Sequence, residues 1–340
     1  MENRTQTICL VILTTIAVAA AMHFLASVLV PFVLAVFFTY CLTPIIDFLT
    51  IRAKLPKSLS LILTALLGSA ILLMLGGVVL NTAGQMSDNA GVYQERFKTM
   101  METISTSLPL DSMGISEGDI SQSLKDMSEM ALKDVLPAIV NASMKLISNG
   151  ALVFIIMLFI LLGRQPGKRE ENNIRSEVEL KVQRYIVTKM IISTLTAFFV
   201  WLTLFLLDID FALVFGVLTF LLNFIPSIGS AIATLLPLPV ILISPEHSVF
   251  AKFLAVLLPG AIQFGFGNIL EPRIMGQTLD LHPITILFAL IFFGMLWGIP
   301  GMFLATPITA IIKIILDKSK SSHMLSEIMA GRLSSVDKGA

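Results

Sequence analysis

The sequence predicts an all-α polytopic membrane protein with six full spans and two broken, re-entrant helical hairpins. Hydrophobic residues make up 56% of the chain and charged residues only 14%, whereas a soluble domain carries about 25% charged residues. The mean hydropathy is +0.89, and several uncharged runs reach the roughly 18 residues that indicate a membrane helix. Two further apolar segments are interrupted by proline and glycine, and these interruptions predict the two hairpins.

The same sequence excludes several classes of protein. The formal net charge is zero and no basic patch is present, which excludes a nucleic-acid-binding protein. The nearest approach to a phosphate-binding loop, Gly167-Lys168, lacks the residues that this motif requires at its other positions. The four histidines are scattered, and no nucleophile is paired with a base. We therefore expect neither an enzyme nor a bound cofactor or metal.

Residues 1–80 form the predicted N-terminal membrane region with three spans. The first two, Ile8–Leu25 and Ser27–Leu49, are separated by so few residues that a tight helical hairpin is expected. The third is Ser58–Leu80. The short loop before it carries three basic residues, Arg52, Lys54 and Lys57. Basic loops stay in the cytoplasm, so the N-terminus is expected there as well.

Residues 81–145 form the only sizeable polar segment, with nine acidic and five basic residues, and are predicted to lie outside the cytoplasm. Leu124, Met127, Ala131 and Val135 recur at helical spacing, which predicts an amphipathic helix beginning near Ser116 or Asp119. This helix is either a packing surface against the membrane region or a neighbouring subunit, or a lid over a pore.

Residues 146–316 form the predicted transport core, and residues 317–340 form a cytoplasmic tail. The full spans of the core are Leu146–Leu162, Met190–Leu207 and Val249–Leu270. The basic helix before Met190–Leu207 is expected to run straight into that span. If the broken hairpins do not cross the membrane, every basic loop falls on the cytoplasmic side, as the positive-inside rule requires. Both termini are then cytoplasmic.

The broken hairpins are Phe211–Ile243 and Ile284–Leu316, interrupted at 223–229 and 298–301. Each arm has about 14 to 18 residues, fewer than the 20 or so that cross a bilayer. Non-helical backbone at membrane depth is tolerated only inside protein or beside a wet cavity, and paired interruptions are typical of transport sites.

The candidate site lies at these interruptions and at the connection between the hairpins. Asn223 and Asn268 offer amide groups at expected helix breaks, and Glu271 and Arg273 flank Pro272, where we expect the helix to stop and the two charges to pair. The residues predicted to bind substrate or to gate its passage are Asn223, Pro226, Gly229, Asn268, Glu271, Pro272, Arg273, Gly276, Pro300 and Gly301. Glu271 and Asp47 are the carboxylates that could couple transport to an ion.

Three stretches resemble the autoinducer-2 exporter family of bacteria, and the likeness extends over nearly the whole chain. They are Leu222-Asn223-Phe224-Ile225-Pro226-Ser227-Ile228-Gly229, Gly267-Asn268-Ile269-Leu270-Glu271-Pro272-Arg273-Ile274-Met275-Gly276 and Gly301-Met302-Phe303-Leu304-Ala305-Thr306-Pro307. The resemblance implies an all-helical transporter of the bacterial inner membrane that exports a small quorum-sensing furanone. It also implies a homo-oligomer, a pentamer in this family.

Three functions remain open at this point. The first is export of a small polar signalling molecule through the broken region, since amides, hydroxyls and backbone line it in place of fixed charges. The second is sodium(lithium)/proton antiport, which some members of the family are described as performing and which needs a titrating carboxylate. The third is a membrane scaffold whose outer segment binds a partner.

Overall fold

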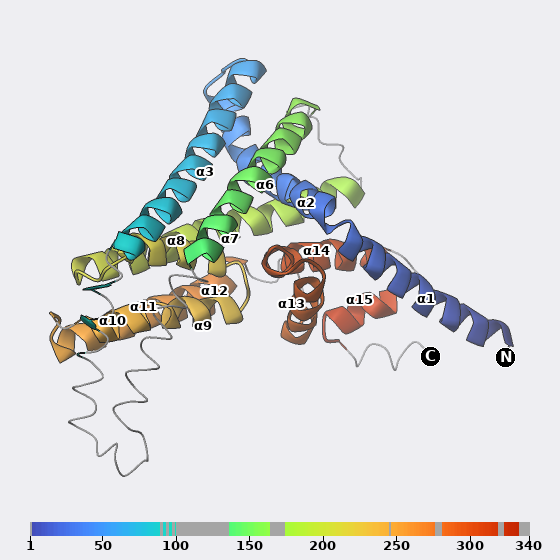
Figure 1. Cartoon of the computed structure of the whole chain (residues 1–340). Coiled ribbons are helices and arrows are strands. Elements are labelled where there is room, and N and C mark those ends of the chain that lie inside the picture. The colour runs from blue at the N-terminus through green and yellow to red at the C-terminus, as the bar shows by residue number, and fades with distance from the viewer. Residues whose placement is uncertain are drawn as a thin grey trace, which may run out of the picture. The chain divides into compact units, whose positions relative to one another are not determined.

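The computed structural model of the protein describes residues 2–88, 91–92, 95–96, 99, 136–163, 174–244, 246–275, 281–318 and 323–332. Throughout these ranges the regular elements are helices and no strand occurs, as the sequence predicts (Figure 1). The amphipathic helix expected between 116 and 135 lies outside the described residues, and so does Gly276.

The helices begin and end as follows. They are α1 (Glu2–Phe24), α2 (Ala26–Asp47), η1 (Phe48–Arg52), α3 (Lys57–Asp88), α6 (Leu136–Gly163), α7 (Ile174–Leu206), α8 (Ala212–Leu222), α9 (Ile228–Leu235), α10 (Leu238–Ile243), α11 (Val249–Phe264), η4 (Gly265–Leu270), α12 (Glu271–Met275), α13 (Pro283–Trp297), α14 (Ile299–Lys318) and α15 (His323–Met329). The helices α3 and α6 extend into the segment 81–145, and α7 is continuous across the predicted junction of basic helix and span.

The chain folds into two compact units. Unit 1 contains residues 1–66, 151–191 and 273–340, and unit 2 contains residues 67–150 and 192–272. Each unit holds one of the interrupted apolar segments: α8 to α10 belong to unit 2, and α13 and α14 belong to unit 1.

Each unit has its own apolar core. In unit 1, α2, α3 and α6 meet in a cluster of buried side chains: Ala35, Leu42, Ile46, Leu61, Val153, Met157 and Leu161. In unit 2, α7, α8, α10 and α11 meet in a second cluster: Val200, Leu204, Ile209, Ala212, Phe215, Ile241 and Ala255. Burial of such side chains against neighbouring helices is what holds each unit in one arrangement.

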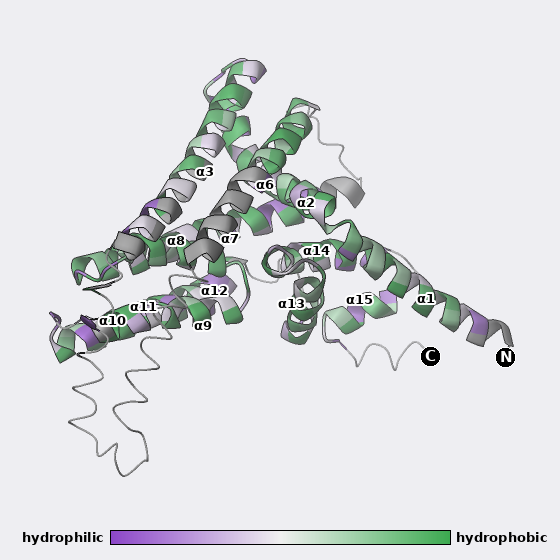
Figure 2. Ribbon diagram, in the orientation of Figure 1, coloured by the Kyte–Doolittle hydropathy of each residue, from purple (hydrophilic) through white to green (hydrophobic). Residues whose placement is uncertain are grey.

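Four described helical segments are long and apolar enough to cross a membrane: Ala26–Arg52, Glu179–Leu206, Val249–Ile274 and Ile299–Lys318. Shorter apolar helices accompany them, and hydrophobic residues recur along the helices (Figure 2). Many large apolar side chains point outward, such as Phe24, Val249 and Met295, as is usual where lipid replaces water as the solvent. The protein is therefore a multi-pass membrane protein.

The arms of the two interrupted segments differ in length more than the sequence indicates. Helix α14 has 20 residues, enough to cross a bilayer alone. Helices α8 and α13 have 11 and 15 residues. The expectation that every arm is too short is wrong for α14, because Pro300 and Gly301 lie inside its first turn and not in the interruption. Proline is tolerated in a first turn, where its missing N–H has no helical partner to lose.

The expected hairpin between α1 and α2 is not formed. Only Leu25 separates the two helices, and its backbone N–H donates to the Ala21 carbonyl oxygen at 2.9 Å while its own carbonyl accepts from Leu29 at 2.9 Å. These are helical i→i−4 bonds on both sides of the junction. Helix α2 therefore continues onward from α1 instead of folding back along it (Figure 1).

Candidate functional site

The helical path of unit 2 is interrupted between α8 and α9. The backbone N–H of Ile225 donates to the Leu222 carbonyl oxygen at 2.8 Å, which closes the end of α8. Pro226 follows and has no N–H to donate. Ser227 has φ 61° and ψ −52°, a backbone conformation that residues other than glycine rarely adopt and that is concentrated at functional sites. The break predicted from the sequence is confirmed here.

Glycine permits a close approach of the helices in both breaks. Gly229 lies in the first turn of α9, and a Cβ atom there would overlap the Leu222 carbonyl oxygen and lie 2.7 Å from the carbonyl carbon. In unit 1, a Cβ atom at Gly301 would overlap the Phe293 carbonyl oxygen and lie 3.0 Å from the Cβ of Trp297. Backbone cannot move aside as a flexible side chain can, so both positions require glycine.

Polar side chains gather where α7 meets the end of α8. Ser193 and Thr196 on α7 and Thr219 and Asn223 on α8 are all buried. The Asn223 Nδ2 donates to the Ser193 Oγ at 3.3 Å. The Oγ1 of Thr219 has no hydrogen-bond partner among the described residues. Buried polar groups usually are hydrogen-bonded, so an unpaired hydroxyl at this place needs an explanation.

Two contacts fix how α7 and α8 are aligned. Toward the N-terminal end of α8, a Cβ atom at Gly216 would lie 2.7 Å from the Cβ of Trp201. Nearer the break, Asn223 donates a hydrogen bond to Ser193. These contacts belong to one antiparallel register, in which Thr219 falls level with residues 197–198, within half a turn of Thr196. The interface between α7 and α8 is thus apolar toward the N-terminal end of α8 and polar toward the break.

Two ion pairs described in unit 2 lie at its other end. Arg96 donates to the carboxylates of Asp210, before α8, and Glu246, before α11, at 2.9 Å each. The Nε2 of His247 lies 3.1 Å from the Asp208 carbonyl oxygen. Ion pairs therefore join the loops at this end, whereas the buried polar groups at the break end are uncharged.

A buried glutamine on α11 was not singled out from the sequence. Gln263 is 5% exposed, and neither its Nε2 nor its Oε1 has a hydrogen-bond partner among the described residues. One polar residue in an apolar helix gives no sign of the face on which it lies. The structure supplies the face, since Ala255, Pro259 and Gln263 recur at four-residue spacing on one buried side of α11.

The break of unit 1 is a single residue, Gly298, with φ 66° and ψ −143°. Helix α1 contacts this break directly. The Trp297 Nε1–H donates to the Met22 carbonyl oxygen at 2.9 Å, and the His23 Nδ1 lies 3.0 Å from the Leu296 carbonyl oxygen. His23 therefore has a backbone partner next to this break.

The predicted site residues are divided between the units. Asn223, Pro226 and Gly229 lie together at the break of unit 2, and Pro300 and Gly301 lie in the first turn of α14 in unit 1. Asn268 is not at a break, because it lies in the π-helical turn η4 with its side chain exposed.

Pro272 does not stop the helix, which corrects the expectation from the sequence. The Glu271 N–H donates to the Phe266 carbonyl oxygen, five residues back, so the turn before the proline is widened. A π-helical turn of this kind absorbs the clash between a proline ring and the preceding turn. Helix α12 then continues through Pro272 to Met275.

Glu271 and Arg273 are consequently two positions apart on a helix. Side chains at this spacing do not face each other, so the expected pairing across Pro272 is not supported. Glu271 is half-buried and Arg273 is exposed.

Alanine substitutions at the two positions should therefore have independent effects. We expect the changes in transport rate and in unfolding temperature for Glu271→Ala plus Arg273→Ala to equal the combined single effects, with a coupling energy below about 0.5 kcal/mol. Partial recovery in the double variant would restore the pairing hypothesis. The measurement is a double-mutant cycle that compares the unaltered protein, both single variants and the double variant in vesicles prepared in the same way.

Unit 1 contains two lysines whose burial was not predicted from the sequence. Lys189 and Lys313 are 3% and 6% exposed, and both interact with other groups. Asp47, the other candidate for ion coupling, ends α2 and is half-buried.

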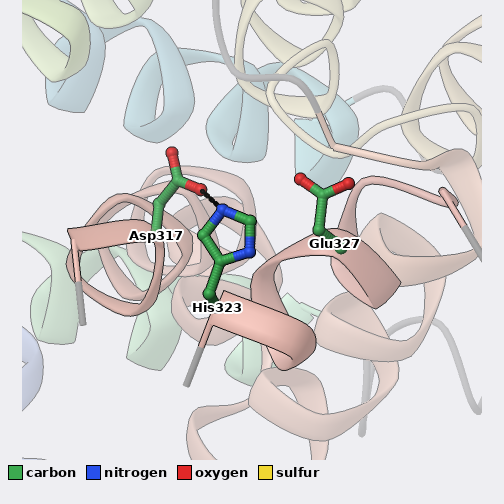
Figure 3. Close-up of side chains that lie close together, drawn as sticks. All are labelled: Asp317, His323 and Glu327. Atoms are coloured by element: carbon green, nitrogen blue, oxygen red, sulfur yellow. Dashed lines mark ion pairs between the residues drawn. The ribbon is translucent and has the colours of Figure 1, made fainter. Parts of the chain in front are cut away.

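Asp317, His323 and Glu327 lie close enough for one ligand atom of each to come within 4.8 Å of the others (Figure 3). Oxygen and imidazole ligands suit zinc or manganese. Their side chains already serve other contacts, however. The Ser326 Oγ donates to the Asp317 Oδ1 at 3.1 Å, and Arg332 lies 3.7 Å from Glu327. The arrangement works as it stands to fasten α15 to α14.

A groove of about 570 Å³ lies between α1, α13 and α14 in unit 1. Its walls are mainly apolar, with Leu10, Val18, Met22, Phe292 and Ile308 among them. None of the site residues predicted from the sequence lines it, and its chemistry suits lipid better than a polar solute.

Comparison with known proteins decides the family. The sequence model described as AI-2E family transporter matches residues 12–321. The chain belongs to the AI-2E transporter family. The AI-2 transport protein TqsA of Escherichia coli is 31% identical over 93% of this chain and 93% of its own length.

Two further AI-2E relatives cover the chain almost as completely. YhhT of Escherichia coli, classed provisionally as a transport protein, is 26% identical over 95% of this chain and 93% of its own length. A protein of Borreliella burgdorferi with the same provisional description is 25% identical over 90% of this chain and 85% of its own length. The resemblance to this family noted from the three sequence stretches is therefore confirmed.

Proposed function

We propose that this protein exports a small, polar, uncharged signalling molecule of the autoinducer-2 type across the bacterial inner membrane. The carrying observation is the set of buried, uncharged polar side chains in unit 2. Ser193, Thr196, Thr219 and Asn223 lie toward the break, and Gln263 lies on α11. A neutral solute with hydroxyl and carbonyl groups can replace its water contacts by hydrogen bonds to such groups. The similarity to TqsA, an AI-2 transport protein, supports the choice of solute.

Antiport of sodium or lithium against protons is the less favoured function. It requires a carboxylate that titrates within the membrane, and the buried polar residues described in unit 2 contain none. Glu271 is half-buried at the edge of that unit. A vesicle assay with a pH-sensitive dye would support antiport if sodium released protons and Glu271→Gln abolished the release.

The test of export uses Escherichia coli cells that lack TqsA and carry this sequence on a plasmid. We expect the internal concentration of autoinducer-2 to fall and the external concentration to rise relative to cells with an empty plasmid. Unchanged levels at normal expression would overturn the assignment of this solute.

The same cells separate a transporter from a scaffold. A scaffold that binds a partner through its outer segment would lose function on deletion of residues 87–134 and tolerate substitution of Asn223 or Pro226. We propose the opposite pattern, together with assembly as a homo-oligomer, which cross-linking in membranes and sizing in detergent would measure.

A further inference from the structure

We propose that the side chain of Gln263 binds the transported solute directly and selects neutral solutes that carry hydroxyl groups. This inference rests on the proposed function, because it names the residue that recognises the solute in unit 2. Neither the family assignment nor the relatives point to this residue.

The first support is the state of the Gln263 carboxamide. The side chain is 5% exposed, yet both its nitrogen and its oxygen lack hydrogen-bond partners among the described residues. An unsatisfied buried polar group costs about 1–3 kcal/mol. A leucine would avoid that cost on the stripe that α11 buries with Ala255 and Pro259. The amide is therefore available for an interaction with a group that the described residues do not supply.

The second support is the position of Gln263 along unit 2. The Lys252 Nζ donates to the Leu242 carbonyl oxygen at 3.0 Å, and a Cβ atom at Gly260 would lie 3.6 Å from the Thr234 Cγ2. Both contacts fit one antiparallel register between α11 and the α9–α10 arm. The register places Gln263 level with α9 about one turn closer to the break than Thr234.

A contact with α7 on the other side also fixes the level of Gln263. Phe266, one turn beyond Gln263, stacks its ring at 5.7 Å from that of Phe199 on α7. Thr196 lies one turn before Phe199 on the same helix, in the direction of the break, and Thr219 of α8 lies close to its level. Because α7 and α11 run in opposite directions, this contact places the unpaired amide of Gln263 about two turns from Thr196, on the side away from the break.

The chemistry of these two groups defines the ligand class. A carboxamide offers two donors and an acceptor, and a threonine hydroxyl offers one donor and two acceptor sites, all without net charge. A solute with hydroxyls can satisfy either group. A small ion would lose its hydration without gaining a compensating charge. A site built to hydrogen-bond a hydroxyl also rejects analogues that lack one, because its own polar groups then stay unpaired.

The experiment measures uptake of autoinducer-2 by everted membrane vesicles that contain the full-length protein. We expect Gln263→Leu to raise the KM for autoinducer-2 about tenfold or more, as the loss of one or two hydrogen bonds predicts. The unfolding temperature should stay the same or rise, because the unpaired amide is gone. Gln263→Asn keeps the amide and should recover part of the affinity.

Ser244→Ala is the matched control. Ser244 is another buried polar residue of unit 2, but it lies at the end of α10 and its Oγ donates to the Val240 carbonyl oxygen at 2.8 Å. The KM of the Ser244→Ala variant for autoinducer-2 should match that of the unaltered protein.

The outcomes separate the two proposals. Transport by the unaltered protein with an unchanged KM in Gln263→Leu would show that the amide serves only the fold or an internal water, and would overturn this inference alone. A lower KM in that variant would overturn it as well. Absence of autoinducer-2 uptake by the unaltered protein would overturn the proposed function and this inference with it.

Discussion

Replacing Gly229 or Gly301 with alanine should sharply reduce the amount of folded, transport-competent protein in the membrane. The added Cβ atom meets the carbonyl group of Leu222 in one case and of Phe293 in the other, and backbone at a helix end cannot yield without opening the break. We expect destabilisation of about 3 kcal/mol or more. The unfolding midpoint, followed by the fluorescence of Trp201 and Trp297, measures this in detergent-purified protein.

Gly265→Ala in unit 2 and Gly163→Ala in unit 1 are the matched controls. A Cβ atom at either position meets nothing within 4 Å. Alanine favours helix over glycine by up to about 1 kcal/mol, so both controls should be neutral or stabilising. The same substitution is expected to lower the stability at Gly229 and Gly301 but not at Gly265 and Gly163. Equal changes in the unfolding midpoint of all four variants would refute the close-approach argument.

Leucine at Asn223 should reduce autoinducer-2 transport by about tenfold or more, whereas leucine at Asn268 should leave it nearly unchanged. The sequence treats the two asparagines alike, but Asn223 is 5% exposed and bonded to Ser193, while Asn268 points outward from η4. Leucine at 223 removes a polar group from the break and leaves Ser193 without that partner.

Transport must be compared at equal amounts of folded protein. Asn223→Leu should keep its unfolding midpoint within a few degrees of the unaltered protein, since an apolar side chain of similar size replaces the amide. A loss of transport that followed loss of folded protein, or an equal loss in Asn268→Leu, would contradict a role for Asn223 in the solute path.

The breaks could be predicted from the sequence because their causes are local. Proline lacks a donor and glycine admits unusual angles wherever they occur, and Pro226, Gly229 and Gly298 all mark real interruptions. The same reasoning failed at Pro272, because a widened turn upstream removes the clash. The prediction also failed at Leu25, because the residue types there do not indicate whether the single residue between two helices bends the chain or reverses it.

Most of the candidate site could not be predicted in this way. Ser193, Thr196, Thr219 and Gln263 are common residues in apolar helices, and nothing in their spacing shows that they belong to one unit. Their importance follows from the antiparallel registers set by Gly216, Gly260 and Asn223. Register is a property of packed helices, so only the folded chain shows it.

The uncharged character of the break end of unit 2 has an electrical consequence. Moving one elementary charge through the full membrane field costs about 2.3 kcal/mol per 100 mV. Among the described residues of unit 2, the buried polar groups carry no charge, and its ion pairs lie at the far loops. A neutral solute handled by these groups alone would displace no charge, so that step of the cycle would run at the same rate in polarised and depolarised membranes.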